Sequence, residues 1–301
     1  MRSFLLRLSN GRSWRIIPTK TTISWVERFA SIMRLKACGP DEDGINIYFI
    51  TDDLEKFTSD SLDPKKYDEL PCYLPGNGWN YSQIGLIKIW QHEDVPDIIC
   101  AVDYKEEYHE PDIILIANFL SFFYNKNLKA GCLPFHAGLV ELNGKGVLLT
   151  APSKTGKSTC CRRIPSPWNT ICDEEVLIVR DTGSGRYHAH PFPTWSDFLE
   201  RNSPGTWDVS RHFPVEAIFL LEQSRKDEVI PVGKGAAASV IYRSAMDACH
   251  RYWVNLSKND ARSLNEAIFH NSCEIAKEIP LFKLRVSISG RFWEEIEIAI
   301  F

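Results

Sequence analysis

Apolar and polar residues alternate along the first part of the chain. Phe4–Leu8 and Ser13–Ile17 have the period of two that is typical of strands, and the Asn10-Gly11 turn between them is a strong signal for a hairpin. Ile23–Leu35 has the spacing of a helix. Further strands are predicted at Ile45–Ile50, Gln83–Gln91 and Ile98–Tyr104, with residues 52–80 as a loop. This pattern predicts a mostly β or α+β region without a chemical motif.

A long helix is predicted next, at Glu110–Asn127, where apolar residues recur at helical spacing and Pro111 suits the first turn. We therefore place a domain boundary near residue 108, between an accessory domain (1–108) and a second domain (109–301). Whether the accessory domain binds a peptide or mediates assembly stays open. In the second domain, strands are predicted at Phe135–Leu142, Val147–Leu149, Thr170–Cys172, Val176–Val179, Arg186–His190, Ala217–Leu221 and Phe282–Ile288, and helices at Gly235–His250, Ser257–Ala276 and Phe292–Phe301.

One segment of the second domain carries chemistry. Val147–Leu149 is an apolar strand that enters a tight loop, and the loop ends in Gly-Lys-Ser-Thr before a short helix. Backbone N–H groups of such a strand–loop–helix face phosphate anions, while its lysine neutralises phosphate charge and its serine hydroxyl binds Mg²⁺. The segment predicts a nucleoside triphosphate site formed by Ser153, Lys154, Thr155, Gly156, Lys157, Ser158 and Thr159.

The phosphate-binding pattern G-x-x-x-x-G-K-[ST] is incomplete here, because Ala151 stands at its first glycine. The preceding strand and the following helix favour a real site. The alternative is a strand, a turn and a helix that bind nothing. Lys154 is expected to contact phosphate or to point into solvent.

Acidic residues follow on the next predicted strand. Asp173-Glu174 comes after Thr170–Cys172, and a phosphate loop needs such a carboxylate to hold Mg²⁺ or to take a proton from the attacking hydroxyl. The alternative is a solvated acidic turn. His136 precedes the loop. A lone histidine in a strand is more often a packed core residue than a catalytic one.

Three further groups of candidate functional residues have weaker support in the sequence. His188 and His190 share one face of a strand, but no third ligand has the spacing of a metal site. Glu222 ends an apolar strand in the manner of an ATPase acid, or simply marks where the strand leaves the core. The aromatic loop Pro191–Trp195 is expected to form a wall for a peptide substrate or to pack in the core.

Composition narrows the class of protein. The chain is 44% hydrophobic and 25% charged, with a net charge of −4, so it is expected to be globular and to bind no nucleic acid. Its nine cysteines have no C-x-x-C spacing and are expected to be reduced thiols of a cytoplasmic protein. Ile113–Tyr124, the most apolar long segment, is too short to span a membrane.

The residues of this core resemble those of a known family. His136-Ala-Gly138, Asn143-Gly-Lys-Gly146, the loop through Thr159 and Asp173-Glu174 are similar to the core of HPr kinases. The resemblance covers about residues 130–195. More loosely it reaches the C-terminus, where the chain is similar to HPr-kinase-like proteins of modified-peptide cassettes, namely the SynChlorMet cassette protein and the lasso-peptide kinases. A further glutamate-containing signature of the bacterial HPr kinases is missing.

The resemblance implies a fold and a set of roles. The fold would be an α+β or α/β, P-loop-containing core of the HPr kinase and PEP carboxykinase type. Asp173 would be the general base, and Glu174, where the family has a second aspartate, would hold Mg²⁺ with Ser158. His136 would contact Asp173 or the transferred phosphate, and Lys157 would complete the catalytic set.

The function expected from these roles is transfer of the γ-phosphate of ATP, with Mg²⁺, to a serine or threonine hydroxyl. The acceptor would be a ribosomally made precursor peptide or a small protein. The alternative is a non-catalytic module that binds nucleotide and a peptide or enzyme of a biosynthetic cassette. A third hypothesis, an NTP hydrolase or transport ATPase with Glu222 as its catalytic acid, has no signature motif to support it. Preference for ATP over GTP and the formation of a homo-oligomer stay open.

Overall fold

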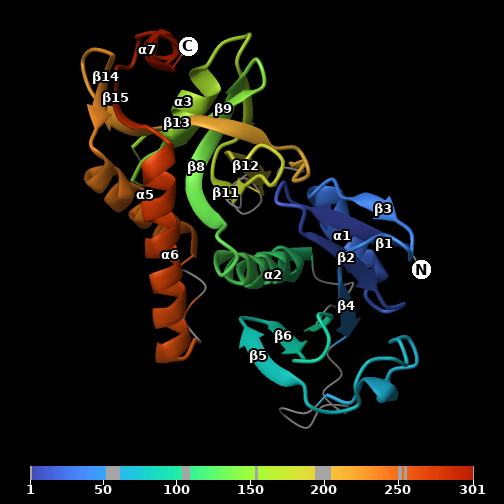
Figure 1. Cartoon of the computed structure of the whole chain (residues 1–301). Helices are drawn as coiled ribbons and strands as arrows, with labels where there is room; N and C mark the ends of the chain where they lie inside the picture. Colours follow the sequence, from blue (N-terminus) through green and yellow to red (C-terminus); the bar gives the residue numbers. More distant parts are fainter. Residues whose placement is uncertain are drawn as a thin grey trace. The chain divides into compact units, whose positions relative to one another are not determined.

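The structure is a computed structural model in which two compact units, Met1–Phe123 and Tyr124–Phe301, each contain a mixed sheet with helices (Figure 1). It describes residues 2–51, 62–103, 109–152, 155–193, 205–249, 253 and 256–300, with backbone only for 109–112. The division between the units lies inside helix α2 (His109–Leu128). The boundary expected near residue 108 stays a prediction.

The first unit is built on a seven-stranded sheet with the order β3-β1-β2-β4-β7-β6-β5. Its strands are β1 (Ser3–Arg7), β2 (Ser13–Pro18), β3 (Lys36–Cys38), β4 (Ile45–Thr51), β5 (Asn80–Ile84), β6 (Ile87–Gln91) and β7 (Ile98–Val102). β2, β4 and β7 are parallel neighbours, and the other pairs are antiparallel. A 3-10 turn, η1 (Pro64–Lys66), lies before β5.

Both faces of this sheet are covered at β4. The Phe49 ring lies 4.8 Å from Trp25 of helix α1 (Ile23–Ile32) and 5.2 Å from Phe119 of α2, measured between centroids. Tyr48 and Ile50 point to the opposite face and pack with residues of the segment before β5, Leu62, Leu70, Leu74 and Trp79. Because successive strand residues face opposite sides, the apolar run of β4 is explained by burial on both.

The predicted Asn10-Gly11 hairpin is confirmed, since β1 and β2 pair antiparallel and Gly11 has a φ of +79°. The single strand predicted at Gln83–Gln91 is wrong. The chain instead turns at Gly85, whose φ is +56°, so that β5 and β6 form a second hairpin. A Cβ at Gly85 would lie 2.4 Å from the side-chain amide of Asn118, which explains why a glycine stands at this turn.

The second unit contains an eight-stranded sheet with the order β10-β8-β11-β12-β13-β15-β14, in which β9 pairs with both β8 and β13. Its strands are β8 (Leu133–Leu142), β9 (Lys145–Thr150), β10 (Asn169–Cys172), β11 (Glu175–Arg180), β12 (Tyr187–Phe192), β13 (Phe213–Gln223), β14 (Glu228–Val232) and β15 (Leu281–Val286). β9, β13 and β15 are parallel, so their carboxyl ends meet at one edge.

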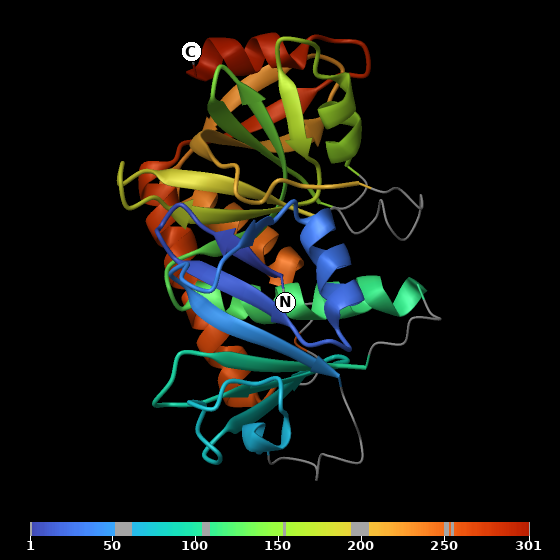
Figure 2. The same ribbon diagram turned by 90° about the vertical axis from the view of Figure 1, so that its right-hand side faces the viewer.

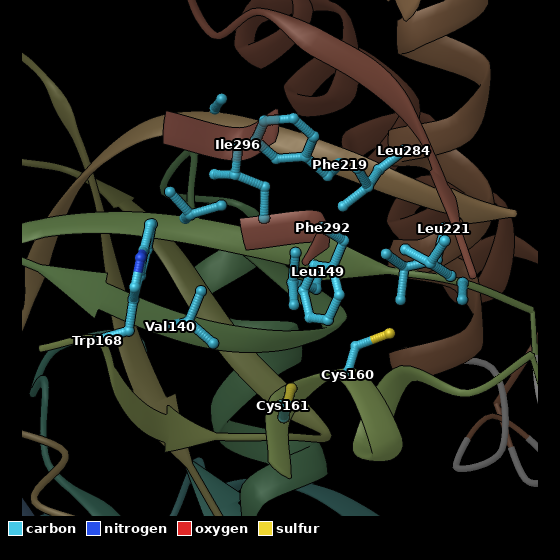
Figure 3. Packing of buried hydrophobic residues seen from close by; sticks show 14 of the residues in the cluster. Val140, Leu149, Cys160, Cys161, Trp168, Phe219, Leu221, Leu284, Phe292 and Ile296 are labelled. Atoms are coloured by element: carbon cyan, nitrogen blue, oxygen red, sulfur yellow. The ribbon is translucent and has the colours of Figure 1, made fainter. Parts of the chain in front are cut away.

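Helices cover the two faces of this second sheet. One face packs against α3 (Lys157–Arg163) and α7 (Phe292–Ile300), where Leu149, Cys161 and Phe292 belong to one buried cluster (Figure 3). The other face carries α5 (Lys234–Cys249), which lies beside the long helix α6 (Lys258–Glu278) (Figure 1). The helix α3, which follows strand β9, is thus packed in the core of the second unit.

Arg163, at the end of α3, ties this helix to the C-terminal part of the unit. Its guanidinium donates hydrogen bonds to the carbonyl oxygens of Ser287 at 2.8 Å and Gly290 at 2.7 Å. The same group lies 5.3 Å above the ring of Phe292, the first residue of α7. Figure 2 shows α7 and α3 at the same end of the second unit. The position of α3 therefore depends on the segment between β15 and α7.

Candidate functional site

The loop between β9 and α3 begins at Ala151 and ends at Gly156. Gly156 precedes the helix with a φ of +108°, which a side chain rarely tolerates. Ala151 has no such requirement: its φ is not positive, and it is 5% exposed within the core cluster. Alanine in place of the first glycine is therefore compatible with this backbone. Ser153 and Lys154 lie outside the described residues.

Lys157 is the first residue of α3, and its side chain turns toward β8. Its Nζ lies 3.0 Å from Nε2 of His136 and 3.5 Å from the backbone oxygen of Glu174. An ammonium group has no lone pair, so Nε2 of His136 accepts this hydrogen bond. The structure thus brings together three of the residues that the sequence singled out, from β8, α3 and the bend after β10.

Asp173 and Glu174 form the bend between β10 and β11, and both are half-buried. Gly138 of β8 lies directly below: a Cβ there would be 3.6 Å from Cα of Asp173 and 2.5 Å from Sγ of Cys161 on α3. Only a glycine lets α3 and the acidic bend approach β8 so closely. This contact explains the third residue of His136-Ala-Gly138.

Burial shapes the electrostatics of Lys157, which is 9% exposed. Desolvation lowers the pKa of its ammonium, and the nearby carboxylates of Glu174 and Asp173 raise it by less. The ammonium is therefore held at an energetic cost beside two carboxylates. A buried lysine with a perturbed pKa, next to a histidine and two acids, is the kind of group that marks a functional site.

His136 is fixed through its backbone. The hydroxyls of Thr150 on β9 and Ser244 on α5 donate to its carbonyl oxygen at 3.1 and 2.8 Å. On β11, Glu175 is its cross-strand partner, so both side chains face the same side of the sheet. Glu175 is 1% exposed, and one oxygen accepts a hydrogen bond of 3.1 Å from the hydroxyl of Tyr124.

The sequence did not single out Glu175, Tyr124 or Ser244. The only local signal is the third acid in Asp173-Glu174-Glu175, which falls inside an otherwise apolar strand. Ser244 lies more than a hundred residues after His136, on a helix, and no spacing rule connects the two.

Ser158 lies next to Lys157 in the first turn of α3, followed by the exposed Thr159. Hydroxyl and carboxylate oxygens are the ligands that Mg²⁺ prefers, so Ser158 and Glu174 fit this ion by their chemistry. Their predicted role as its ligands stays a prediction. Within the part of the chain that the structure describes, no group of three or more His, Cys, Asp and Glu side chains could hold a metal ion.

The histidine pair on β12 lies away from the loop. His190 is fully buried, and its Nδ1 lies 2.8 Å from the carbonyl oxygen of Val209. His188 instead faces His212, with 2.8 Å between their Nδ1 atoms. Burial lowers the pKa of His190 to about 3 and also lowers that of His188, for which the charge of His212 adds to the effect. His190 is thus a neutral core residue at neutral pH.

Two other candidates have structural partners. Glu222 accepts hydrogen bonds from Lys283 at 2.8 Å and Arg285 at 3.0 Å, which is unlike an acid left free for hydrolysis. Phe192, in the segment expected as a substrate wall, belongs to β12 and is buried against Tyr124, with 5.4 Å between ring centroids. Trp195 lies outside the described residues.

Among the described residues, no helix has the length and apolar character needed to cross a membrane.

Comparison with known proteins places more than half of the chain in a family. Residues 98–301, which include every residue of this site, match the family model described as SynChlorMet cassette protein ScmC. No curated protein matches the chain. Among solved structures, the Hpr(Ser) kinase/phosphatase from Coxiella burnetii matches at 12% identity, over 55% of this chain and 90% of that chain, with a TM-score of 0.29.

Proposed function

The chain belongs to the family of the SynChlorMet cassette protein ScmC, and we propose that it is a P-loop kinase that transfers the γ-phosphate of ATP to a peptide hydroxyl. The observation that carries this proposal is the meeting of Lys157 with His136 and with the acidic bend at Asp173-Glu174. The loop motif supplies phosphate recognition, and the bend supplies carboxylates on the side that Lys157 faces.

The proposed roles follow from the chemistry of phosphoryl transfer, in which the protein mainly positions groups and neutralises charge. Lys157 neutralises charge on the phosphate oxygens, and Asp173 takes the proton of the acceptor hydroxyl. His136 holds Lys157 in place through Nε2. Mg²⁺ bound by Ser158 and Glu174 would add positive charge at the transferred group. The acceptor is a serine or threonine of a ribosomally made precursor peptide, as the cassette family suggests.

The test is incubation of the full chain with γ-labelled ATP, Mg²⁺ and a candidate precursor peptide. Label in the peptide, lost in Lys157→Ala and in Asp173→Asn, is the expected result. Tight ATP binding without transfer to any peptide would instead support a nucleotide-dependent binding module. Steady release of phosphate without an acceptor would support an NTP hydrolase. Either of these outcomes contradicts the kinase.

A further inference from the structure

A cleft of about 490 Å³ opens beside the phosphate loop, and the proposed reaction leaves it without a role. Pro152 and Thr155 of the loop form one wall, while the end of β13 and Lys283 of β15 form the other. The cleft therefore lies at the edge where the carboxyl ends of β9, β13 and β15 meet. In sheets with parallel strands, ligands bind outside these carboxyl ends.

The cleft and the acidic bend lie on opposite sides of β9. On one side β9 pairs with β8, which carries His136 and pairs in turn with β10 and β11, the strands that flank Asp173. On the other side β9 pairs with β13, which forms the cleft. A triphosphate in the loop has a reactive end and a nucleoside end. With the reactive end at Lys157, the cleft on the β13 side of β9 is the space left for the nucleoside end.

Glu222 provides a hydrogen-bond acceptor in the lining of this cleft. Its two oxygens are held by Lys283 and Arg285, at 2.8 and 3.0 Å, and these cations keep the pKa of its carboxyl below the ordinary value. An ionised carboxylate accepts up to about four hydrogen bonds, so acceptor capacity remains after both contacts. The side chain is 41% exposed. The result is a carboxylate of fixed orientation at the wall of the cleft.

The charges of the wall favour a neutral donor over a second anion. Lys283, the cation of this wall, already has Glu222 as its carboxylate partner. Arg285, which does not line the cleft, pairs with Glu222 and also with Glu228, the latter at 2.9 Å. A pair of neighbouring hydroxyl groups is the complementary chemistry, and an acidic side chain that accepts from ribose hydroxyls is a general solution in nucleotide-binding sheets. Gln223 donates to the carbonyl oxygen of Thr155 at 3.1 Å, which ties this wall to the loop.

We propose that this cleft holds the nucleoside of the triphosphate and that Glu222 accepts hydrogen bonds from the ribose 2′- and 3′-hydroxyls. The inference rests on the proposed function, which it extends to a preference for ribonucleotides. Glu222 is a specificity residue in this account, and the transferred phosphate lies on the far side of β9.

The test compares three probes, ATP, 2′,3′-dideoxy-ATP and inorganic tripolyphosphate, by calorimetric titration of the full chain with Mg²⁺. The wild-type chain is expected to bind ATP about 10- to 100-fold more tightly than dideoxy-ATP, the range of hydrogen bonds to a charged group. Glu222→Gln keeps only a neutral acceptor oxygen, so it is expected to reduce this difference and to leave tripolyphosphate affinity unchanged. Glu228→Gln is the matched control, since Glu228 also pairs with Arg285 but does not line the cleft.

Three results would overturn the inference. The first is an undiminished preference for ATP over dideoxy-ATP in Glu222→Gln, and the second is the absence of such a preference in the wild-type chain. The third is an equal loss in Glu228→Gln, which would assign the effect to Arg285. Failure of the proposed function looks different: ATP binds with the expected dependence on ribose, yet no phosphate reaches a peptide. Absence of binding by all three probes would overturn both.

Discussion

The ammonium of Lys157 lies 3.0 Å from Nε2 of His136, across a contact between the first turn of α3 and the middle of β8. Contacts with other residues fix the position of both His136 and the helix that carries Lys157. Thr150 and Ser244 fix the backbone of His136, and Arg163 fixes the far end of α3. Lys157 is therefore kept in a partly desolvated position at a cost in stability, which leads to the first prediction.

Replacing Lys157 by methionine is expected to stabilise the fold and to abolish phosphoryl transfer. Burial lowers the pKa of the ammonium more than the acids raise it, so its charge is unfavourable in the folded chain. Its removal should raise the free energy of unfolding by on the order of 1 kcal/mol, as often happens at functional sites. Urea unfolding measures this change. Lys145→Met, at an exposed position on β9, is the control and should change neither property. A clear loss of stability in Lys157→Met would contradict the argument.

Asp173→Asn is expected to lower the rate of transfer by about 10²- to 10⁴-fold, the usual contribution of a general base. The amide keeps the size of the side chain but cannot take the proton of the acceptor. Binding of ATP should change much less than the rate, so single-turnover kinetics and a binding titration together separate the two effects. The control is Asp247→Asn on an exposed position of α5. Substantial transfer by Asp173→Asn would refute the base role.

Gly138→Ala is expected to destabilise the second unit by about 1–3 kcal/mol, the cost of overpacking a core. The new Cβ would lie 2.5 Å from Sγ of Cys161, so α3 or the cysteine must move. Chemical denaturation measures the loss. The double variant Gly138→Ala, Cys161→Ala should recover part of it, beyond the effect of Cys161→Ala alone. If the double variant is as unstable as the sum of the single ones, the close approach of α3 is not the cause.

The stability of the chain is expected to fall in mild acid because of His190. Burial lowers the pKa of this imidazole to about 3 in the folded chain, whereas the ordinary value is about 6.5. Below about pH 6.5 the unfolded chain binds a proton that the folded one does not, so the contribution is complete above that pH and is lost as the pH falls. The loss between pH 7 and pH 5 should be about 2 kcal/mol.

His190→Asn provides the comparison for this pH effect, because its amide can still donate to Val209, as Nδ1 does in the wild type. Urea unfolding at pH 7 and pH 5 should show that this variant loses about 2 kcal/mol less stability than the wild type over this pH range. An identical pH dependence in both proteins would show that other groups cause the acid sensitivity.

Local signals in the sequence predicted much of the fold. The hairpin turns at Asn10-Gly11 and Asn143-Gly144, and the start of α3 after Gly156, follow from residues that accept positive φ. The turn at Gly85 was missed because Gly85 and Leu86 lie within one strand-like run, so nothing marks the reversal. The short edge strands β3 and β14 lack a clear alternating pattern of their own and depend on pairing for their conformation.

Single residues of the site could be predicted from the sequence, but the contacts between them could not. Gly156 and Lys157 belong to a motif, and the acids at Asp173 and Glu174 follow from the need of such a loop for a carboxylate. The pairing of Lys157 with His136 depends on the register of β8 with β9. The contacts of Glu222 with Lys283 and Arg285 depend on the parallel pairing of β13 with β15, two strands about sixty residues apart in the sequence.

The hydrogen bonds from Arg163 to the carbonyl oxygens of Ser287 and Gly290 connect α3 to the C-terminal part of the second unit. The helix that begins with Lys157 is anchored at its other end by a guanidinium that reaches the turn before α7. A helix of seven residues, about two turns, is therefore all that separates this turn from Lys157. Substitutions in this turn are therefore expected to shift Lys157 without replacing a residue of the site.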